Sequence, residues 1–347
     1  MARLPLKVGL LSPPWVPVPP PAYGGTELMV DQLARGLTAA GQHVTLYATG
    51  DSTAPATIAH SIGAAAEDRI GEGALELRHA MNGYEALVGC DVIHDHTLVG
   101  PAWALASGQA RVVTTCHGPF ADELRSIYRR YATRLPVVAI SRDQAARAPE
   151  IAVSRVIHHG LDHDRFPMGL GDGGYLLFLG RMAPDKGVRE AALLARAAGR
   201  PLLIAAKMRE PSEHAYFAEQ VRPLLGDDVT YVGEATNGTK IELLAGAVAL
   251  LNPIRWPEPF GLVMTEALAC GTPVLTCPRG AAPEIVDDGV TGFLCADDKA
   301  MVDAIGRVEE LDRAACRAAV AERFSTARMV EAYIALYEEV AGGDSGR

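Results

Sequence analysis

Short apolar runs alternate with helical patterns along most of the chain, and this alternation limits the fold more than any other feature. Each run is bounded by glycine, proline or polar residues and is apolar nearly throughout, which is typical of parallel strands covered on both faces. Parallel strands need crossover connections, usually helices. In the first half we predict strands at Lys7–Leu11, His43–Ala48, Asp91–His94, Arg111–Cys116, Val137–Ile140 and Arg155–His158.

The same order of elements begins again in the second half. A chain of 347 residues exceeds the usual single core, so two domains are expected. The glycine-rich segment 166–175 separates the halves and predicts a linker. We therefore predict an α/β fold of two doubly wound domains, 1–167 and 168–325. The predicted strands of the second are Tyr175–Leu179, Pro201–Ala206, Val229–Val232, Val248–Leu251 and Pro273–Thr276.

Two helices have clear boundaries. The first is predicted to begin at a Thr26 cap and to end before Gly41. The second is amphipathic, covers residues 326–341 and has Ser325 or Thr326 available as its cap. Its spacing is compatible with packing on the second domain or with crossing back to the first.

Composition excludes several classes of protein. The formal net charge of −10 argues against a nucleic acid or an anionic membrane as the main partner. The six cysteines form no CxxC pair and have no metal-ligand spacing with histidine, which indicates reduced thiols. No apolar run approaches the length of a membrane span. We expect a cytoplasmic protein without a transmembrane segment.

Two cations follow the first predicted strand of the second domain. Ligands of open parallel sheets bind outside the carboxyl ends of the strands. Arg181 and Lys186 lie there, on a turn bounded by glycines. A guanidinium and an ammonium group can bind a diphosphate without a metal. The alternative is a pair of solvated surface cations.

Two carboxylates surround the start of a predicted helix at 262–270. Gly261 allows an anion to approach the free N–H groups there. Glu258 precedes the helix and Glu266 lies just over one turn inside it. Ionised carboxylates bind sugar hydroxyls well, so a nucleotide sugar is a suitable ligand. The alternatives are a glycosidase acid and base, which need opposite faces of a sugar, or a helix-dipole partner and a loop charge.

Two further patterns resemble other kinds of site. The glycines in residues 169–174 fit G-x-G-x-x-G, but they precede a strand, whereas a dinucleotide fingerprint follows one and opens a helix. The DVIHDH segment, residues 91–96, contains metal-ligand types with unusual spacing. We expect neither a dinucleotide nor an essential metal.

Several ordered motifs together resemble a known family. They are YGGTE at 23–27, DVIHDH at 91–96, HG at 117–118, AISR at 139–142, HHGLDHDRF at 158–166, GRMAPDKG at 180–187, EPFGLVMTE at 258–266 and RGAAPEIVDDGVTGFLC at 279–295. The chain resembles the GT-B retaining glycosyltransferases, in particular family 4, whose motif is E-x7-E. One departure is His158-His159-Gly160-Leu161-Asp162, where such families often have P-N-G-V-D.

The resemblance implies two Rossmann-like domains that face across a cleft, with the C-terminal helix packed back on the first domain. It implies that Glu266 binds the donor ribose, that Glu258 holds sugar hydroxyls, and that His117 contacts the sugar. A general-base role for His117 is the less favoured alternative. The implied catalytic residues are His117, Arg181, Lys186 and Glu258. The implied donor-binding residues are Gly24, Gly25, Arg181, Lys186, Val232, Glu258, Phe260, Gly261, Leu262 and Glu266, and the acceptor side comprises Tyr23, Thr26 and His117.

The implied reaction is retaining transfer of a hexose-type sugar from a nucleotide-diphosphate donor, with UDP-sugar favoured, to a hydroxyl acceptor. The acceptor is expected to be a small soluble molecule or a glycan. The proline-rich segment 13–21 is expected to form an acceptor-side wall or a rigid connector. The alternatives are a sugar-nucleotide epimerase, a phosphorylase-like enzyme, or a noncatalytic sugar-nucleotide-binding protein.

Overall fold

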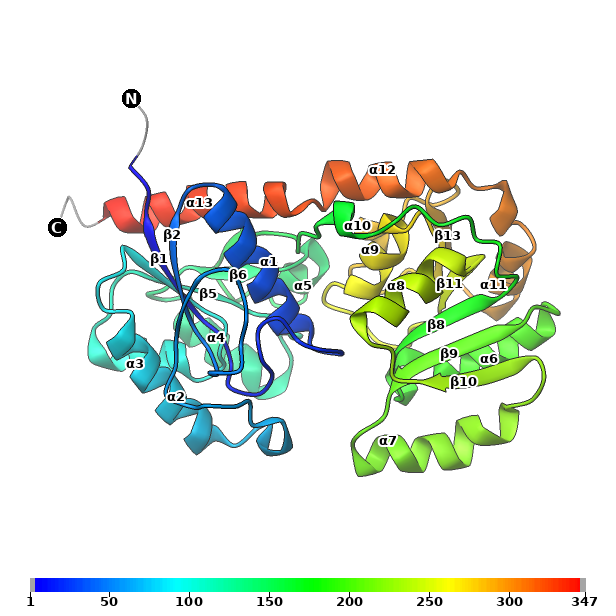
Figure 1. Cartoon of the computed structure of the whole chain (residues 1–347), viewed down its shortest axis with the longest axis horizontal. Helices are drawn as coiled ribbons and strands as arrows, with labels where there is room; N and C mark the ends of the chain where they lie inside the picture. Colours follow the sequence, from blue (N-terminus) through cyan, green and yellow to red (C-terminus); the bar gives the residue numbers. More distant parts are fainter. Residues whose placement is uncertain (1–3, 344–347) are drawn as a thin grey trace. The chain divides into compact units, whose positions relative to one another are not determined.

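The computed structural model describes residues 4–343 and divides into two compact units. Within the described residues, unit 1 consists of 4–160 and 326–343, and unit 2 of 161–325. Each is a parallel sheet with crossover helices, so the predicted pair of Rossmann-like domains is confirmed (Figure 1). Within residues 4–343, no helix combines the length and the apolar character that crossing a membrane requires.

Unit 1 contains a seven-stranded parallel sheet in the order β3-β2-β1-β4-β5-β6-β7. The six predicted strands are present, with the last displaced two residues toward the N-terminus relative to its predicted start at Arg155. β3 was not predicted because its three residues are exposed or half-buried and lack an apolar run. The strands are β1 Lys7–Leu11, β2 His43–Tyr47, β3 Thr57–Ala59, β4 Val92–Asp95, β5 Val112–Thr115, β6 Val137–Ala139 and β7 Val153–Val156.

The terminal helix α13, Thr326–Gly342, is part of unit 1 and packs beside α1, Gly25–Ala39 (Figure 1). Its apolar face joins Tyr333 and Tyr337 to the buried core that covers the sheet. Gly36 lets the two helices approach, because a Cβ there would lie 2.4 Å from Val330. The remaining helices of the unit are α2 Gly73–Ala86, α3 Gly100–Ser107, α4 Asp122–Tyr131 and α5 Arg142–Ala146.

The prediction that Thr26 caps the first helix is wrong. The helix begins at Gly25, its N-cap is Gly24, and no side chain caps it. Thr26 therefore lies inside the first turn. Two glycines begin this helix because the preceding loop packs closely against it: a Cβ on Gly24 would lie 2.7 Å from Pro20 Cβ.

Unit 2 contains a six-stranded parallel sheet in the order β10-β9-β8-β11-β12-β13. The five predicted strands are present, and the short β13 was not predicted. The strands are β8 Leu176–Arg181, β9 Leu202–Lys207, β10 Val229–Gly233, β11 Ala249–Asn252, β12 Val274–Thr276 and β13 Gly292–Leu294. The helices of four or more residues are α6 Val188–Ala197, α7 Pro211–Tyr216, α8 Asn237–Gly246, α9 Leu262–Ala269, α10 Ala282–Ile285, α11 Asp298–Ile305 and α12 Arg313–Arg323, with a π-helical segment at Phe217–Val221.

The boundary between the units lies at 160/161, whereas the sequence predicts 167/168. Hydrogen bonds explain the difference. Leu161 N–H donates to Phe324 O at 2.7 Å, and Arg317 Nη2 donates to His163 O at 2.9 Å. Phe324 and Arg317 both belong to unit 2. The residues just before the glycine-rich segment are therefore already hydrogen-bonded to that unit.

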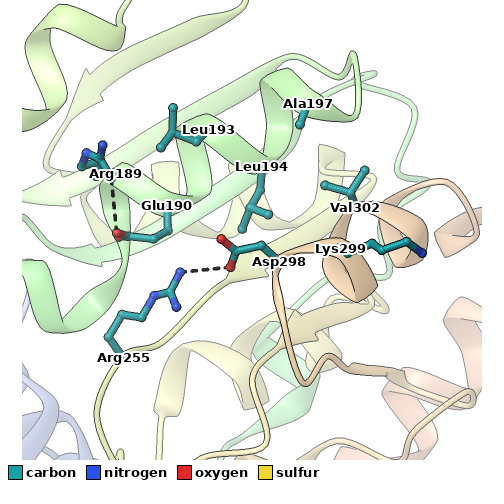
Figure 2. Close-up of a pocket in the computed structure, with 9 residues that line it drawn as sticks. All are labelled: Arg189, Glu190, Leu193, Leu194, Ala197, Arg255, Asp298, Lys299 and Val302. Atoms are coloured by element: carbon teal, nitrogen blue, oxygen red, sulfur yellow. Dashed lines mark hydrogen bonds and ion pairs between the residues drawn. The ribbon is translucent and has the colours of Figure 1, made fainter.

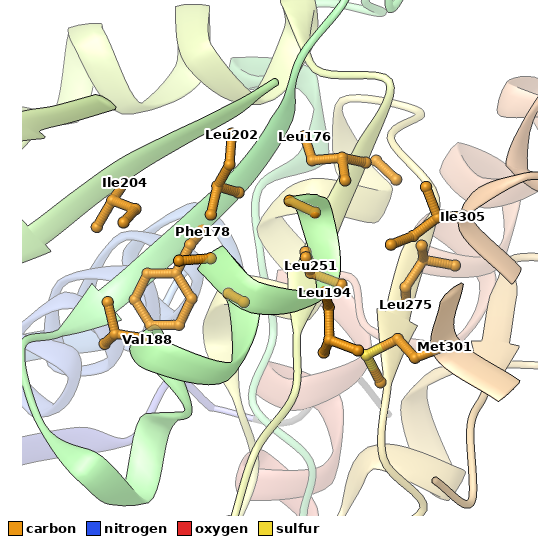
Figure 3. Packing of buried hydrophobic residues seen from close by; sticks show 14 of the residues in the cluster. Leu176, Phe178, Val188, Leu194, Leu202, Ile204, Leu251, Leu275, Met301 and Ile305 are labelled. Carbon is orange, nitrogen blue, oxygen red and sulfur yellow. The ribbon is translucent and has the colours of Figure 1, made fainter. Parts of the chain in front are cut away.

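The core of unit 2 fills the space between the sheet and the helices α6 and α11. Phe178, Leu251 and Leu275 project from the sheet toward Leu194 and Met301 of the two helices (Figure 3). All five side chains are at most 4% exposed. Burying such side chains stabilises a domain by roughly 1.5–3 kcal/mol each, which makes the sheet a rigid support for the loops at its carboxyl edge.

Gly187 joins the turn after β8 to α6 and offers a test of this support. Its φ is +78°, and a Cβ would lie 2.2 Å from the Pro253 carbonyl oxygen of the neighbouring loop. We expect Gly187→Ala to lower the free energy of unfolding by about 2 kcal/mol or more, from backbone strain and the clash. Urea denaturation measures it.

The matched control is Gly199→Ala. Gly199 also has a positive φ, +64°, but no atom lies within 4 Å of the site of its Cβ. That variant should lose only about 1 kcal/mol, the cost of the left-handed conformation. Equal losses in the two variants would show that the contact between the two loops does not matter.

Candidate active site

The two predicted cations lie on one turn at the carboxyl end of β8. Arg181 ends the strand, and Lys186 ends the 3-10 turn Pro184–Lys186 that follows. Arg181 Nη2 donates to Asp185 Oδ2 at 3.3 Å, and both side chains are about one-third exposed. The guanidinium group therefore retains other N–H groups for a ligand.

Lys186 contacts Glu258 of the loop after β11. Its Nζ donates to Glu258 Oε2, and Trp256 Nε1 donates to the same oxygen at 3.2 Å. The ammonium group also lies 4.8 Å from the centroid of the Trp256 ring, within cation–π distance. The side chains of Lys186 and Glu258 are only 13% and 16% exposed. Lys186, predicted to bind a phosphate, and Glu258, predicted to bind a sugar, thus form an ion pair with each other.

Backbone contacts hold this loop in place. Arg255 N–H donates to Asp185 O at 2.8 Å, which ties the loop to the turn after β8. Ala281 N–H donates to Glu258 O at 2.9 Å. Gly280, with φ +60°, permits this approach, because a Cβ there would lie 2.3 Å from the backbone of Glu258. The Glu258 carboxylate is therefore positioned by three segments of unit 2.

Glu266 is held by a residue that the sequence analysis did not single out. Lys240 on α8 donates from Nζ to Glu266 Oε1 at 2.5 Å. The two side chains are 15% and 5% exposed. The helix that carries Glu266 begins after Gly261, which has φ +96°. This conformation favours glycine, and it leaves the first N–H groups of α9 directed out of the helix.

Charges at this edge of unit 2 cancel. Three cations, Arg181, Lys186 and Lys240, face the carboxylates of Asp185, Glu258 and Glu266 in three pairs. The pairing lowers the repulsion that the two glutamates would exert on an incoming diphosphate. Each ammonium group has three N–H donors and each carboxylate has two oxygens, so a pair can hold its partner and still bind a ligand.

The other predicted donor residues surround the two glutamates or lie at a strand end. Phe260 is buried and makes an edge contact with Phe324, with ring centroids 6.0 Å apart. Leu262 is the first residue of α9. Val232 lies near the end of β10 and is 45% exposed, unusual for a residue of a strand. Phe260 supports the loop, whereas Val232 offers an apolar surface.

The two predicted donor-binding glycines of unit 1, which form a glycine loop, lie at the start of α1. Gly24 and Gly25 begin the helix, Tyr23 is 43% exposed and Thr26 is half-buried. Glu27 is buried beside them, and burial raises the pKa of its carboxyl group to about 7. The segment is thus a helix N-terminus with small residues and one buried carboxyl group. An anion or a hydroxyl group can approach this N-terminus.

The proline-rich segment 13–21 is fastened to unit 1. Val18 is fully buried in the core, and its backbone N–H donates to Ser52 Oγ at 3.0 Å. Its carbonyl oxygen accepts from the N–H groups of Thr53 and Ala54. These contacts give the segment a fixed course.

His117 follows β5 and belongs to a cluster of four histidines, which is completed by His94, His96 and His159. Its Nε2 lies 2.9 Å from His96 Nδ1, and its ring stacks on that of His159 at 5.3 Å. Burial lowers the pKa of His117 to about 4 and holds the pKa of the other three well below the ordinary value. The four rings are therefore neutral at pH 7.

In the DVIHDH segment, the Asp95 carboxylate, which was considered as a metal ligand, accepts hydrogen bonds. Asp95 accepts from Tyr84 OH and from Thr97 N and Oγ1, each at 2.7 Å. Burial raises the pKa of Asp95 to about 7. Among residues 4–343, no group of three or more histidine, cysteine, aspartate or glutamate side chains is arranged to hold a metal ion.

A hollow of about 340 Å³ lies between α6 and α11. Arg255 pairs with Asp298 at 3.1 Å on one side, and Arg189 lies 3.8 Å from Glu190 on the other (Figure 2). Neither Glu258, Glu266, Arg181 nor Lys186 lines it. Because none of these predicted binding residues lines it, we do not assign the ligand to this hollow.

Lys240, Trp256 and His96 are among the residues of the site whose contacts the sequence analysis did not predict. Lys240 lies on a separate helix, and nothing in its local sequence links it to Glu266. Trp256 stands two positions before Glu258, so the indole next to the first glutamate was a usable signal. His96 was considered only as a metal ligand; its contact with His117 depends on the pairing of β4 with β5.

Family comparisons agree with the motifs. Residues 23–165 match the family described as Glycosyltransferase Family 4, and residues 173–310 match the family described as Glycosyl transferases group 1. The first match lies in unit 1 apart from its last five residues, and the second lies in unit 2. The chain therefore belongs to the GT-B glycosyltransferases. Its N-terminal domain is of the family 4 type and its C-terminal domain of the group 1 type.

Individual relatives are similar over different lengths. D-inositol 3-phosphate glycosyltransferase of Mycolicibacterium smegmatis is 32% identical over 207 residues, which are 52% of this chain and 46% of that protein. The chain thus aligns with about half the length of that relative. Glycogen synthase of Mycobacterium tuberculosis H37Rv is 29% identical over 88% of this chain and 87% of its own.

A solved structure shows the same fold over the whole chain. The crystal structure of AviGT4, a glycosyltransferase involved in avilamycin A biosynthesis, has 27% sequence identity and a TM-score of 0.74. The similarity covers 98% of this chain and 99% of that one. The fold is therefore common to both chains over nearly their whole length.

The pairing of Lys240 with Glu266 predicts a loss of stability. Lys240→Met leaves the nearly buried Glu266 carboxylate without its cation, so we expect the free energy of unfolding to fall by about 2 kcal/mol or more. Adding Glu266→Gln should recover part of the loss, because the uncompensated charge is then gone. Urea denaturation of the two single variants and the double variant measures the coupling.

Lys299→Met is the control. Lys299 pairs with Asp303 at 2.9 Å, but the side chains are 85% and 61% exposed. Its loss should change stability little, because an exposed pair contributes almost nothing. Additive effects of Lys240→Met and Glu266→Gln would contradict the proposed dependence of Glu266 on Lys240.

Proposed function

We propose that the protein is a retaining glycosyltransferase that moves a hexose-type sugar from a nucleotide-diphosphate donor to a hydroxyl acceptor. One observation carries the proposal. At the carboxyl edge of unit 2, two glutamates are each neutralised by a lysine beside a third cation, Arg181. Such paired carboxylates can accept hydrogen bonds from sugar hydroxyls without repelling the diphosphate.

Each group has a role in the proposed reaction. Glu266 binds the ribose hydroxyls and Glu258 those of the transferred sugar. Arg181, Lys186 and the N-terminus of α9 stabilise the charge that develops on the leaving diphosphate. The acceptor hydroxyl attacks from the face that the diphosphate leaves and gives its proton to the departing phosphate oxygen, so the anomeric configuration is retained. This chemistry needs no metal, because the cations are supplied by side chains.

Unit 1 contributes His117 and the glycine loop in this proposal. His117 binds a hydroxyl of the sugar, and the loop at Gly24 and Gly25 approaches the phosphates. The acceptor is a small soluble polyol or a glycan. The names of two relatives, an inositol phosphate glycosyltransferase and a glycogen synthase, support acceptors of both kinds.

A thermal-shift screen tests the donor. A ligand that binds only the native state raises its melting temperature. We expect nucleoside diphosphates and their sugars to raise it, and the screen begins with UDP and UDP-hexoses, the donors that we favour. ADP, GDP and their sugars complete the set. No shift with any of them at millimolar concentration would contradict the donor proposal.

Product analysis then separates the enzyme alternatives. With a binding donor and a panel of polyols, a transferase releases the nucleoside diphosphate and forms a glycoside of the donor's own anomeric configuration, which NMR couplings report. An epimerase changes the free sugar nucleotide and forms no glycoside. Tight donor binding without release of a nucleotide would indicate a noncatalytic binding protein.

The two cations give the mutational test. We expect Arg181→Ala and Lys186→Ala each to lower kcat/KM by about 10- to 100-fold, the effect of losing a hydrogen bond to a charged group. The control is Glu322→Ala, an exposed residue of α12. Steady-state kinetics with varied donor measures all three. Effects of the same size in the three variants would count against a diphosphate site.

A further inference from the structure

His96 and His117 are placed side by side by the sheet of unit 1. β4 and β5 are neighbouring parallel strands in which His94 pairs with Val113 and Asp95 with Thr114. His96 and His117 follow these two strands at the same edge. The backbone N–H of His96 donates to Leu11 O at 2.9 Å, which extends the pairing of β4 with β1. The short distance between the two rings is therefore a property of the sheet.

Neighbouring rings pack against both imidazoles. His94 uses both of its nitrogens, with Nδ1 2.7 Å from Tyr337 OH and Nε2 2.8 Å from Thr115 Oγ1. Its ring packs against that of His96, with centroids 4.0 Å apart. On the other side, His159 stacks on His117 with an interplanar angle of 17°. His96 and His117 are thus confined between two further rings.

The protons of this pair can be counted. A neutral imidazole carries one N–H, and the contact of His96 Nδ1 with His117 Nε2 needs one donor. Either His96 donates, and His117 then carries its proton on Nδ1, or His117 donates, and His96 then carries its proton on Nε2. His96 Nε2 and His117 Nδ1 are both buried, and neither has a hydrogen-bond partner within the described residues.

Both free nitrogens are buried, so the exposure of the two residues and their proposed roles distinguish the arrangements. His96 is only 6% exposed, so an N–H on its Nε2 stays without an acceptor at all times. Orphaned buried N–H groups are rare because each loses its hydrogen bond to water. His117 is partly exposed as a residue although its Nδ1 is buried, and it is the residue proposed to contact the sugar. A ligand oxygen at His117 Nδ1 would satisfy an N–H at that position and remove its cost.

We propose that His96 is a positioning residue that donates from Nδ1 to His117 and thereby holds His117 as a hydrogen-bond donor at Nδ1. This inference rests on the proposed role of His117 as a contact to a sugar hydroxyl. The ligand oxygen accepts the hydrogen bond, and the nitrogen that faces it has no lone pair. His117 therefore orients a hydroxyl oxygen and does not act as the general base.

The first test reads the protons directly. Full-length protein with 15N-labelled histidine is studied by NMR at pH 7, where a bare ring nitrogen resonates far from a protonated one, and His117→Gln assigns the signals. We expect a protonated Nδ1 and a bare Nε2 in His117. A protonated Nε2 in His117 would overturn the proposal. This readout needs no substrate, so it stands even if the proposed reaction is wrong.

The second test changes the donor at residue 96. His96→Leu removes it, whereas the amide N–H of His96→Asn can occupy the place of Nδ1. We expect His96→Leu to mix the His117 tautomers and to raise KM about tenfold with a smaller change in kcat, the effect of losing one hydrogen bond. His96→Asn should keep the tautomer and recover most of the affinity.

Two outcomes of the second test would contradict the proposal. One is an unchanged His117 tautomer in folded His96→Leu. The other is a large fall in kcat with an altered pH profile in both variants, which would indicate that the His pair transfers a proton. Melting temperatures of the variants verify folding, and if His96→Leu does not fold, the tautomer of the wild-type protein decides alone.

Discussion

The contact between Lys186 and Glu258 organises the candidate donor site. It joins the turn after β8 to the loop after β11, two segments that the parallel sheet brings to one edge. Its effect is chemical as well as structural, because a carboxylate that is already neutralised can stand beside a diphosphate. Glu266 is neutralised in the same way, by the ammonium group of Lys240. Two glutamates at this edge are compatible with an anionic ligand only because each has a lysine.

The candidate groups of unit 1 depend on neutral hydrogen bonds instead. His94 connects the cluster to Tyr337 of the terminal helix, and Thr115 connects it to Tyr333. Residues at the far end of the chain thus complete the surroundings of His117. In such a buried group each N–H needs an acceptor, so the position of one proton affects the next. Ion pairs therefore hold the candidate groups of unit 2, whereas neutral hydrogen bonds hold those of unit 1.

Much of the fold could be predicted from local patterns. Apolar runs predicted eleven strands, most of which are largely buried in the structure. β3, which has no apolar run, and the short β13 were not predicted. The domain boundary was placed too late because Arg317, far along the chain, ties residues 163–166 to unit 2. Helix starts are also local, yet Thr26 failed as a cap because the two glycines before it already begin the helix.

The sequence by itself determined the alternation of strands and helices, the two-domain plan and the motifs that resemble family 4. These depend on neighbouring residues and on the strand-end rule, so no distant contact was needed to predict them. Only the tertiary structure determined which charged side chains form ion pairs and which histidines share a hydrogen bond. Lys240 reaches Glu266 across two helices, and His96 reaches His117 across two paired strands. Such contacts arise from packing between segments, which spacing along a chain does not encode.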